Sequence, residues 1–150
     1  MKGMAILLAM TIAGAGTGIE TEIAVETETE AEVSYSDDDL WYMSHTVQAE
    51  AGCCEREMQE GVASVIMNRV NSDLFPNSVM ECILQPGQYS TASYLSTQEP
   101  TEQVIDVCID ILENGSKFPE NVLYQANFVQ GSGVYKSLST SYSTMFFCYQ

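Results

Sequence analysis

The sequence predicts an α+β fold that is mostly helical and carries a small antiparallel sheet at its C-terminal end. Apolar residues recur at helical spacing between residues 40 and 114. Two short β-prone runs, 122–128 and 144–149, follow and flank a Gly131-Ser132-Gly133 turn. With 150 residues, 45% of them hydrophobic, the chain can form one core.

The first helix is expected to begin at Asp37-Asp38-Asp39. Carboxylates at a helix start satisfy free N–H groups and meet the positive end of the helix dipole. Leu40, Met43 and Val47 then repeat at spacings of three and four, and Gly52 ends the run.

Three further segments complete the helical part. A heavily buried helix is expected over 55–70, and one or two helical turns over 78–84. Pro86-Gly87 then forces an irregular loop. The strongest helical pattern covers 101–114, where Asn114-Gly115 provides a C-terminal cap.

The charge distribution argues against nucleic-acid binding. Twenty-one acids against five bases give a net charge of −16, which repels a phosphate backbone. Nine of these acids and no base fall within 19–39, so this segment is interpreted as an acidic disordered linker that precedes a domain over 40–150.

Residues 1–18 are interpreted as a signal peptide or a short N-terminal anchor. Lys2 is followed by a charge-free run, Met4 to Ala13, that ends in small residues. A bilayer core of about 30 Å requires roughly 20 apolar residues, so this run is too short to span it. The prediction is a secreted or wall-associated protein whose membrane association, if any, uses this segment alone.

The five cysteines are interpreted as structural. Their number is odd and no two have the C-x-x-C spacing, which disfavours a zinc site. We therefore expect neither a metal nor a cofactor.

Glu50 is the candidate catalytic residue. It lies three, seven and ten residues after apolar positions of the first predicted helix, so it falls on the apolar stripe near the C-terminal end. The negative end of the dipole, partial burial and nearby Glu55 and Glu57 would favour its protonated form, which a general acid requires. The alternative is an exposed residue at a fraying helix end.

Four segments in order carry a family resemblance. They are Ala49-Glu50-Ala51-Gly52, Asn68-Arg69-Val70, Phe75-Pro76-Asn77-Ser78-Val79 and Gln85-Pro86-Gly87-Gln88-Tyr89-Ser90. Together they resemble the SleB-type cell wall hydrolases, the spore cortex-lytic family. A looser likeness continues through 122–127 and 144–148. The chain departs from the family in having Cys53-Cys54 in place of Gly-Glu, and Met145 in place of a histidine.

The resemblance implies a lysozyme-like fold that cleaves the β-1,4 bond between N-acetylmuramic acid and N-acetylglucosamine in peptidoglycan glycan strands. Glu50 would be the general acid and base. We favour a lytic transglycosylase, because its attacking group is the muramyl C6 hydroxyl and no second carboxylate is obligatory. A muramidase would need a partner acid, for which Glu57 and Asp73 are candidates.

The remaining candidate residues have two roles. Amide side chains and an aromatic ring on the loop after Leu84 are expected to bind sugar. Residues of the strand expected over 122–128 would form the opposite wall of the sugar-binding cleft. Two further residues are expected to brace the site. The sugar-binding candidates are Gln85, Gln88, Tyr89, Tyr124, Gln125 and Asn127, and the supporting candidates are Asn68 and Arg69.

Two other classes of function remain open. A cysteine hydrolase, such as an amidase acting on the stem peptide, would use Cys53 or Cys54 with His45, the only histidine. A non-catalytic wall-binding module is suggested by Met145 in place of the family histidine. In each case we expect a monomer.

Overall fold

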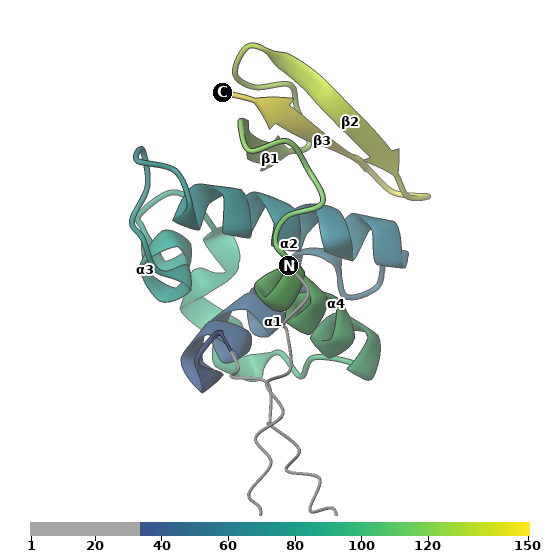
Figure 1. Cartoon of the computed structure of the whole chain (residues 1–150). Helices are drawn as coiled ribbons and strands as arrows, with labels where there is room; N and C mark the ends of the chain where they lie inside the picture. Colours follow the sequence, from purple (N-terminus) through teal and green to yellow (C-terminus); the bar gives the residue numbers. More distant parts are fainter. Residues whose placement is uncertain (1–33) are drawn as a thin grey trace, which may run out of the picture. The chain divides into compact units, whose positions relative to one another are not determined.

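The computed structural model describes residues 34–150, so the predicted segment 1–18 and most of 19–39 lie outside the described residues. Its helical elements come first and its sheet last, which confirms the predicted α+β class (Figure 1). The elements are α1 (Asp37–Ala51), α2 (Arg56–Val70), α3 (Val79–Leu84), the 3-10 helix η1 (Ser90–Thr97), α4 (Glu102–Asn114), β1 (Val122–Ala126), β2 (Gly133–Ser139) and β3 (Thr144–Tyr149).

Helix α1 begins with a capping box. The Ser36 hydroxyl accepts a hydrogen bond from the backbone N–H of Asp39, and the Asp39 carboxylate accepts one from the Ser36 N–H. The three acids Asp37, Asp38 and Asp39 form the first turn, so the last residues of the segment 19–39 are helical. No helix among residues 34–150 has the length and apolar character needed to cross a bilayer.

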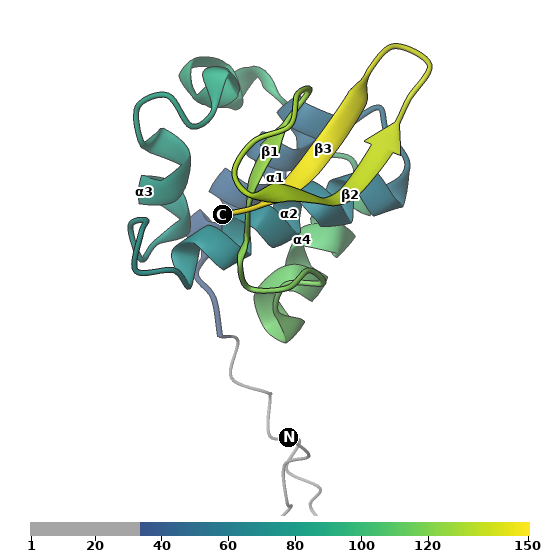
Figure 2. The same ribbon diagram turned by 90° about the horizontal axis from the view of Figure 1, so that it is seen from above.

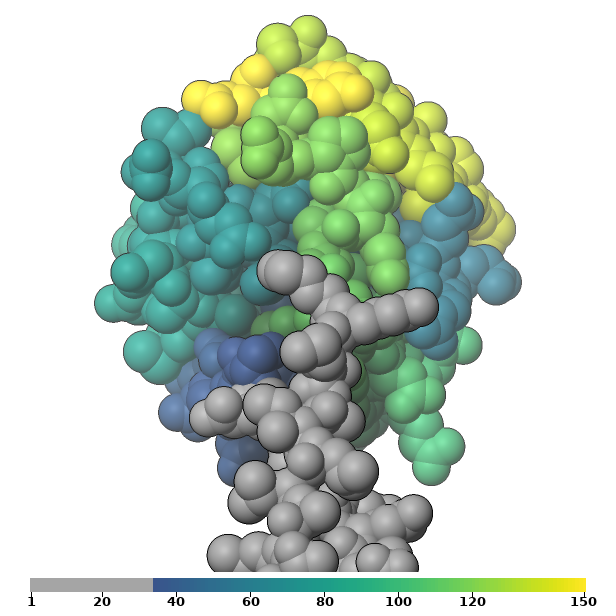
Figure 3. Space-filling view, in the orientation of Figure 1, coloured from purple at the N-terminus to yellow at the C-terminus, as the bar shows by residue number. Residues whose placement is uncertain are grey.

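Helix α2 is the central element. Every residue from 61 to 66 is buried, and α2 contacts α1, α3, α4 and β1. The strands lie above α2 in Figure 1, with α1 and α4 below it, and they form the upper surface in the space-filling view (Figure 3). Seen from above, α3 lies to one side of the sheet (Figure 2). Because α2 packs against the strands on one side and against α1 and α4 on the other, its side chains set the distance between these two layers.

The sheet has the strand order β1-β3-β2 and is antiparallel throughout. The two predicted runs do pair, as β1 and β3. The strand β2 was not predicted, because its residues are mostly exposed or half-buried and lack the apolar content of a strand that faces a core.

Phe147 of β3 packs directly on α2. It is completely buried, and a Cβ added at Gly61 would lie 2.5 Å from its Cζ atom. Only a residue without a side chain therefore allows the ring to reach the backbone of α2. This contact fixes the face of the sheet that carries Phe147 as the inner one.

A side chain at position 61 should destabilise the fold. Gly61→Val is expected to lower the free energy of unfolding by about 1–3 kcal/mol through overpacking against Phe147. Urea unfolding measures the change. The control Glu60→Gln, one residue earlier, should change it by no more than about 0.5 kcal/mol because its ion pair with Arg56 is at the surface. Equal stability of Gly61→Val and wild type would contradict the packing described.

Candidate active site

Glu50 lies in the last turn of α1 and is half-buried. The Oγ1 hydroxyl of Thr91 donates a hydrogen bond of 2.8 Å to its Oε1 atom. Thr91 is 6% exposed and belongs to the first turn of η1, so the bond joins two elements that are distant in sequence. One carboxylate oxygen is thus held in place, and this bond leaves the other oxygen free for a ligand.

The turn that follows Glu50 is anchored by buried Gln59 of α2. Its side-chain amide donates to the carbonyl oxygens of Ala51 and Cys54, at 3.3 and 3.1 Å. Its Oε1 accepts a 3.0 Å hydrogen bond from the side chain of Gln103 on α4. The end of α1 is therefore tied to both neighbouring helices.

Tyr89 lies at the end of the Gln85–Tyr89 loop and is only 7% exposed. Burial raises the pKa of its phenol to about 12, although the charge of Arg69 works in the opposite direction and that of Glu50 in the same one. The phenol is consequently protonated at neutral pH. Because both the ring and the hydroxyl of Tyr89 are buried, the residue lacks the stacking surface that the sequence analysis expected.

Arg69 connects the loops and the sheet. Its Nε donates a 2.8 Å hydrogen bond to the carbonyl of Leu123 on β1. Its guanidinium lies over the rings of Phe75 and Tyr89, with Cζ 5.2 Å from each centroid. The adjacent Asn68 donates hydrogen bonds of 2.8 and 3.0 Å to the carbonyls of Pro119 and Val122. The C-terminal end of α2 thus holds β1 in position.

Four buried side-chain atoms among residues 34–150 have no hydrogen-bond partner. They are Arg69 Nη1, Gln85 Oε1, the Tyr89 hydroxyl and Gln125 Oε1. Buried polar atoms are normally paired, so each of these four calls for a partner that the described residues do not supply. Every one of the four belongs to a residue that the sequence analysis had selected as a site residue.

The two site candidates on β1, Tyr124 and Gln125, lie on opposite faces of the sheet because successive side chains of a strand alternate. Gln125 pairs with Phe147 in the ladder, so both side chains are on the inner face, toward α2. Tyr124 pairs with Cys148 on the opposite face, where a Cβ added at Gly131 would lie 3.0 Å from its ring. The structure therefore places Tyr124 under the β1–β2 connection and away from the inner face that carries Gln125.

The other two sugar-binding candidates are outside regular elements. Asn127 is exposed and follows the last residue of β1. Gln88 is half-buried, and its backbone N–H donates to the Gln85 carbonyl at 3.2 Å. This bond closes the turn around Gly87, whose φ of +83° suits glycine.

The alternative catalytic groups lack the contacts they would need. His45 Nδ1 lies 2.7 Å from the Trp41 carbonyl and its ring stacks on the Trp41 indole, within α1. In the described part of the chain, no hydrogen bond joins it to Cys53 or Cys54. Glu57 is exposed and forms an ion pair with Lys136 of β2, and Asp73 is exposed as well.

Thr91 is the site residue that sequence reasoning missed. It directly follows the Gln85–Ser90 segment, but nothing in the spacing connects it with Glu50, which is 41 residues earlier. Only the packing of η1 against α1 brings the two side chains together.

Comparison with known proteins identifies the family. A profile described as Cell Wall Hydrolase matches residues 55–147, which is more than half of the chain. The chain therefore belongs to the cell wall hydrolase family, as the motifs had indicated. Glu50 lies just before the matched residues.

The curated relatives are spore cortex-lytic enzymes. Those of Oceanobacillus iheyensis and Bacillus subtilis are 35% and 34% identical to this chain over 94 residues, or 62% of it. The match covers 34% and 30% of these proteins, so the chain spans about a third of the length of the relatives.

Two solved structures resemble the fold. One is the catalytic domain of the germination-specific lytic transglycosylase SleB from Bacillus anthracis, with a TM-score of 0.57 and 25% identity over 75% of this chain and 96% of that one. The other is the catalytic domain of the Bacillus cereus SleB protein, with a TM-score of 0.57 and 26% identity over 75% and 91%. The fold is thus that of a SleB catalytic domain.

Removing the Arg69 side chain should destabilise the described domain strongly. Arg69→Ala loses a bond to a buried carbonyl and the packing against two rings, so we expect a loss of about 2–4 kcal/mol in the free energy of unfolding. The matched control is Arg56→Ala, whose surface ion pair with Glu60 contributes about 0–1 kcal/mol. Urea unfolding of both variants provides the comparison, and similar losses in the two would argue against a bracing role for Arg69.

Proposed function

We propose that this chain is a peptidoglycan-cleaving glycosidase that acts as a lytic transglycosylase on the bond between N-acetylmuramic acid and N-acetylglucosamine. The observation that carries the proposal is the half-buried Glu50, whose Oε1 atom is held by a hydrogen bond from Thr91. Membership of the family and the SleB relatives support it. It follows that the protein works outside the cytoplasmic membrane, on glycan strands, and needs no cofactor.

The reaction requires one group that gives and then takes a proton. Glu50 protonates the glycosidic oxygen as the bond to the muramyl C1 breaks and the sugar gains oxocarbenium character. The resulting carboxylate then accepts the proton of the muramyl C6 hydroxyl as that oxygen attacks C1. Thr91, by donating to Oε1, stabilises the carboxylate between the two steps.

The state of the two candidate partner acids is the reason for preferring transglycosylation to hydrolysis. A hydrolysing enzyme usually has a second carboxylate within about 5–9.5 Å of the first. Glu57 and Asp73, the candidates for that role, are both exposed. Glu57 is also occupied by Lys136.

The unpaired polar atoms suit an N-acetylated sugar. Oε1 of Gln85 and of Gln125 can accept from hydroxyl groups or acetamido N–H groups, whereas Arg69 Nη1 and the Tyr89 hydroxyl can donate to carbonyl oxygens. Acceptors and donors on the loop, on α2 and on β1 would together orient one sugar against Glu50. Tyr124 is left out of this set because of its place on the other face of β1.

Glu50→Gln should abolish turnover. Losing a general acid costs typically 10²–10⁴-fold in rate, so clearing of a peptidoglycan suspension should become undetectable or nearly so while the melting temperature stays unchanged. The matched control Glu57→Gln should retain activity. Mass spectrometry of the products distinguishes the reactions: 1,6-anhydromuramic ends identify a transglycosylase, reducing muramic ends a muramidase, and free stem peptides an amidase. Binding of the wall by wild type without clearing would favour the non-catalytic module.

Thr91→Val should slow the chemical step. A hydrogen bond to a charged group contributes about 1.5–3 kcal/mol, which corresponds to roughly a 10- to 100-fold lower kcat. KM and the melting temperature should change little, and Thr91→Ser should restore most of the rate. An equal loss in the serine variant would show that the role of Thr91 is packing rather than positioning.

A further inference from the structure

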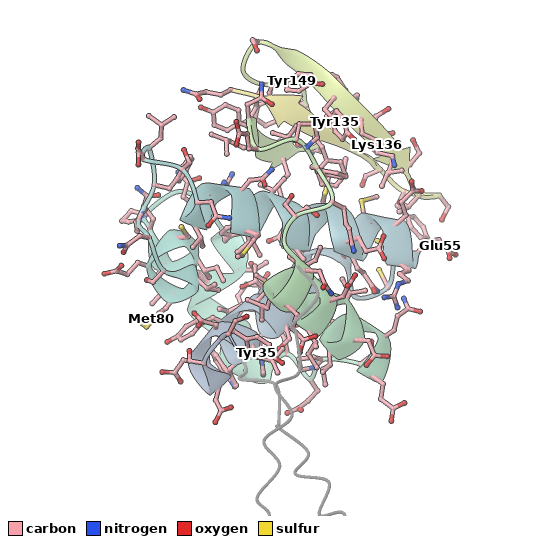
Figure 4. The ribbon with its side chains drawn as sticks, in the orientation of Figure 1. Tyr35, Glu55, Met80, Tyr135, Lys136 and Tyr149 are labelled. Carbon is pink, nitrogen blue, oxygen red and sulfur yellow. The ribbon has the colours of Figure 1, made fainter. Side chains whose placement is uncertain are left out.

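Two adjacent cysteines line a pocket outside the candidate active site. Cys53 is exposed and Cys54 half-buried, in the turn between α1 and α2. The pocket has a volume of about 370 Å³, and its walls come from residues 53–55, 57 and 58 on one side and 138–141 of the β2–β3 hairpin on the other. Figure 4 shows Glu55 and Lys136 at this end of the molecule.

The thiol reactivity of the chain is concentrated at this pocket. The other three cysteines, Cys82, Cys108 and Cys148, are buried. Burial raises the pKa of Cys82 to about 11 and that of Cys108 to about 12, so both keep their protons and are shielded from solvent. Cys53 and Cys54, by contrast, are exposed and half-buried, respectively.

The short distance between adjacent residues indicates that a disulfide between Cys53 and Cys54 would be reversible rather than permanent. Neighbouring Cα atoms are about 3.8 Å apart across a trans peptide, which is shorter than the roughly 4.4–6.8 Å of ordinary disulfides. A bond between these two sulfurs would therefore be strained and easily reduced, as regulatory disulfides are. Residues 34–150 contain no group of three or more His, Cys, Asp or Glu side chains suited to a metal ion, so a metal site is disfavoured.

We propose that Cys53 and Cys54 form a thiol–disulfide exchange site for small neutral or cationic disulfides. The Cys53 thiolate attacks one sulfur of R–S–S–R, which expels RS⁻ and leaves a mixed disulfide on Cys53. Cys54 gives its proton to solvent and attacks the Cys53 sulfur, which expels the second RS⁻ and joins the two cysteines. Two protein thiols are oxidised, and one small disulfide is reduced to two thiols.

The exposure of the two thiols indicates which cysteine attacks the small disulfide and which one then attacks the mixed disulfide. Cys53 is open to solvent and therefore meets the incoming disulfide first. Burial, the neighbouring Cys53 and the charge of Glu55 raise the pKa of Cys54 above its usual value. Cys54 is thus the poorer nucleophile toward a free reagent, but it lies beside the sulfur that it must attack.

The negative charge around the pocket determines which small disulfides react fastest. Glu55 is exposed and forms no ion pair in the described residues, whereas Lys136 is neutralised by Glu57. With a net charge of −16 in addition, the protein repels anionic disulfides and concentrates cationic ones near the mouth of the pocket. Cystamine should consequently react faster than glutathione disulfide.

The experiment follows the thiols of the full reduced chain by mass. After incubation with cystamine at low salt, acid quenching, denaturation and alkylation, two of the five thiols should be lost and no adduct retained. Peptide mapping should locate the loss at 53 and 54. The rate should exceed that with glutathione disulfide on the order of 10-fold, by a margin that shrinks as salt is added.

Single variants separate the two roles. Cys54→Ser should hold a persistent mixed disulfide on Cys53, because the group that expels it is missing. Cys53→Ser should react much more slowly than wild type. The proposal is overturned if all five thiols of wild type remain alkylatable, if the modification maps to another cysteine, or if glutathione disulfide reacts faster than cystamine. None of these outcomes depends on glycan cleavage, so the proposed function is tested separately.

Discussion

The arrangement of the candidate site depends on the contacts made by the buried guanidinium of Arg69. A charge in a protein interior is costly unless other groups replace its lost hydration. Here a backbone carbonyl of β1 and the faces of Phe75 and Tyr89 do so, and no carboxylate among residues 34–150 forms an ion pair with it. One side chain thus draws together α2, the loop before η1 and the first strand. Its Nη1 atom, which has no hydrogen-bond partner in the described part of the chain, faces the same problem of hydration.

Under the proposed function, a single carboxylate would be sufficient. Glu50 has a hydroxyl donor on one oxygen, while the acids that could have formed a pair with it are exposed or already paired. Met145, which replaces the family histidine, is half-buried and packs against the hydrophobic core. Its thioether adds apolar contact where a histidine would add a titratable group.

The sequence was a good guide where local periodicity controls structure and a poor one where distant segments meet. The helical spacing in 101–114 and the acids at 37–39 predicted α4 and the start of α1, because both depend on nearby residues. The motif residues that carry unpaired atoms were found through resemblance. Thr91 was missed because its partner is on another helix, and β2 because its side chains are mostly polar. The side on which Tyr124 lies depends on the irregular register between Val122 and Tyr124, which the strand pattern does not reveal.

The close approach of Phe147 to Gly61 has a consequence for how such sequences diverge. The phenyl ring occupies the space in which a methyl group at position 61 would lie, so the identities of the two residues are coupled although they are in different layers. Homologous chains that gain a larger residue on the helix should carry a smaller one on the strand. The two positions ought therefore to covary, and an ancestral change at one would have opened the way for a change at the other.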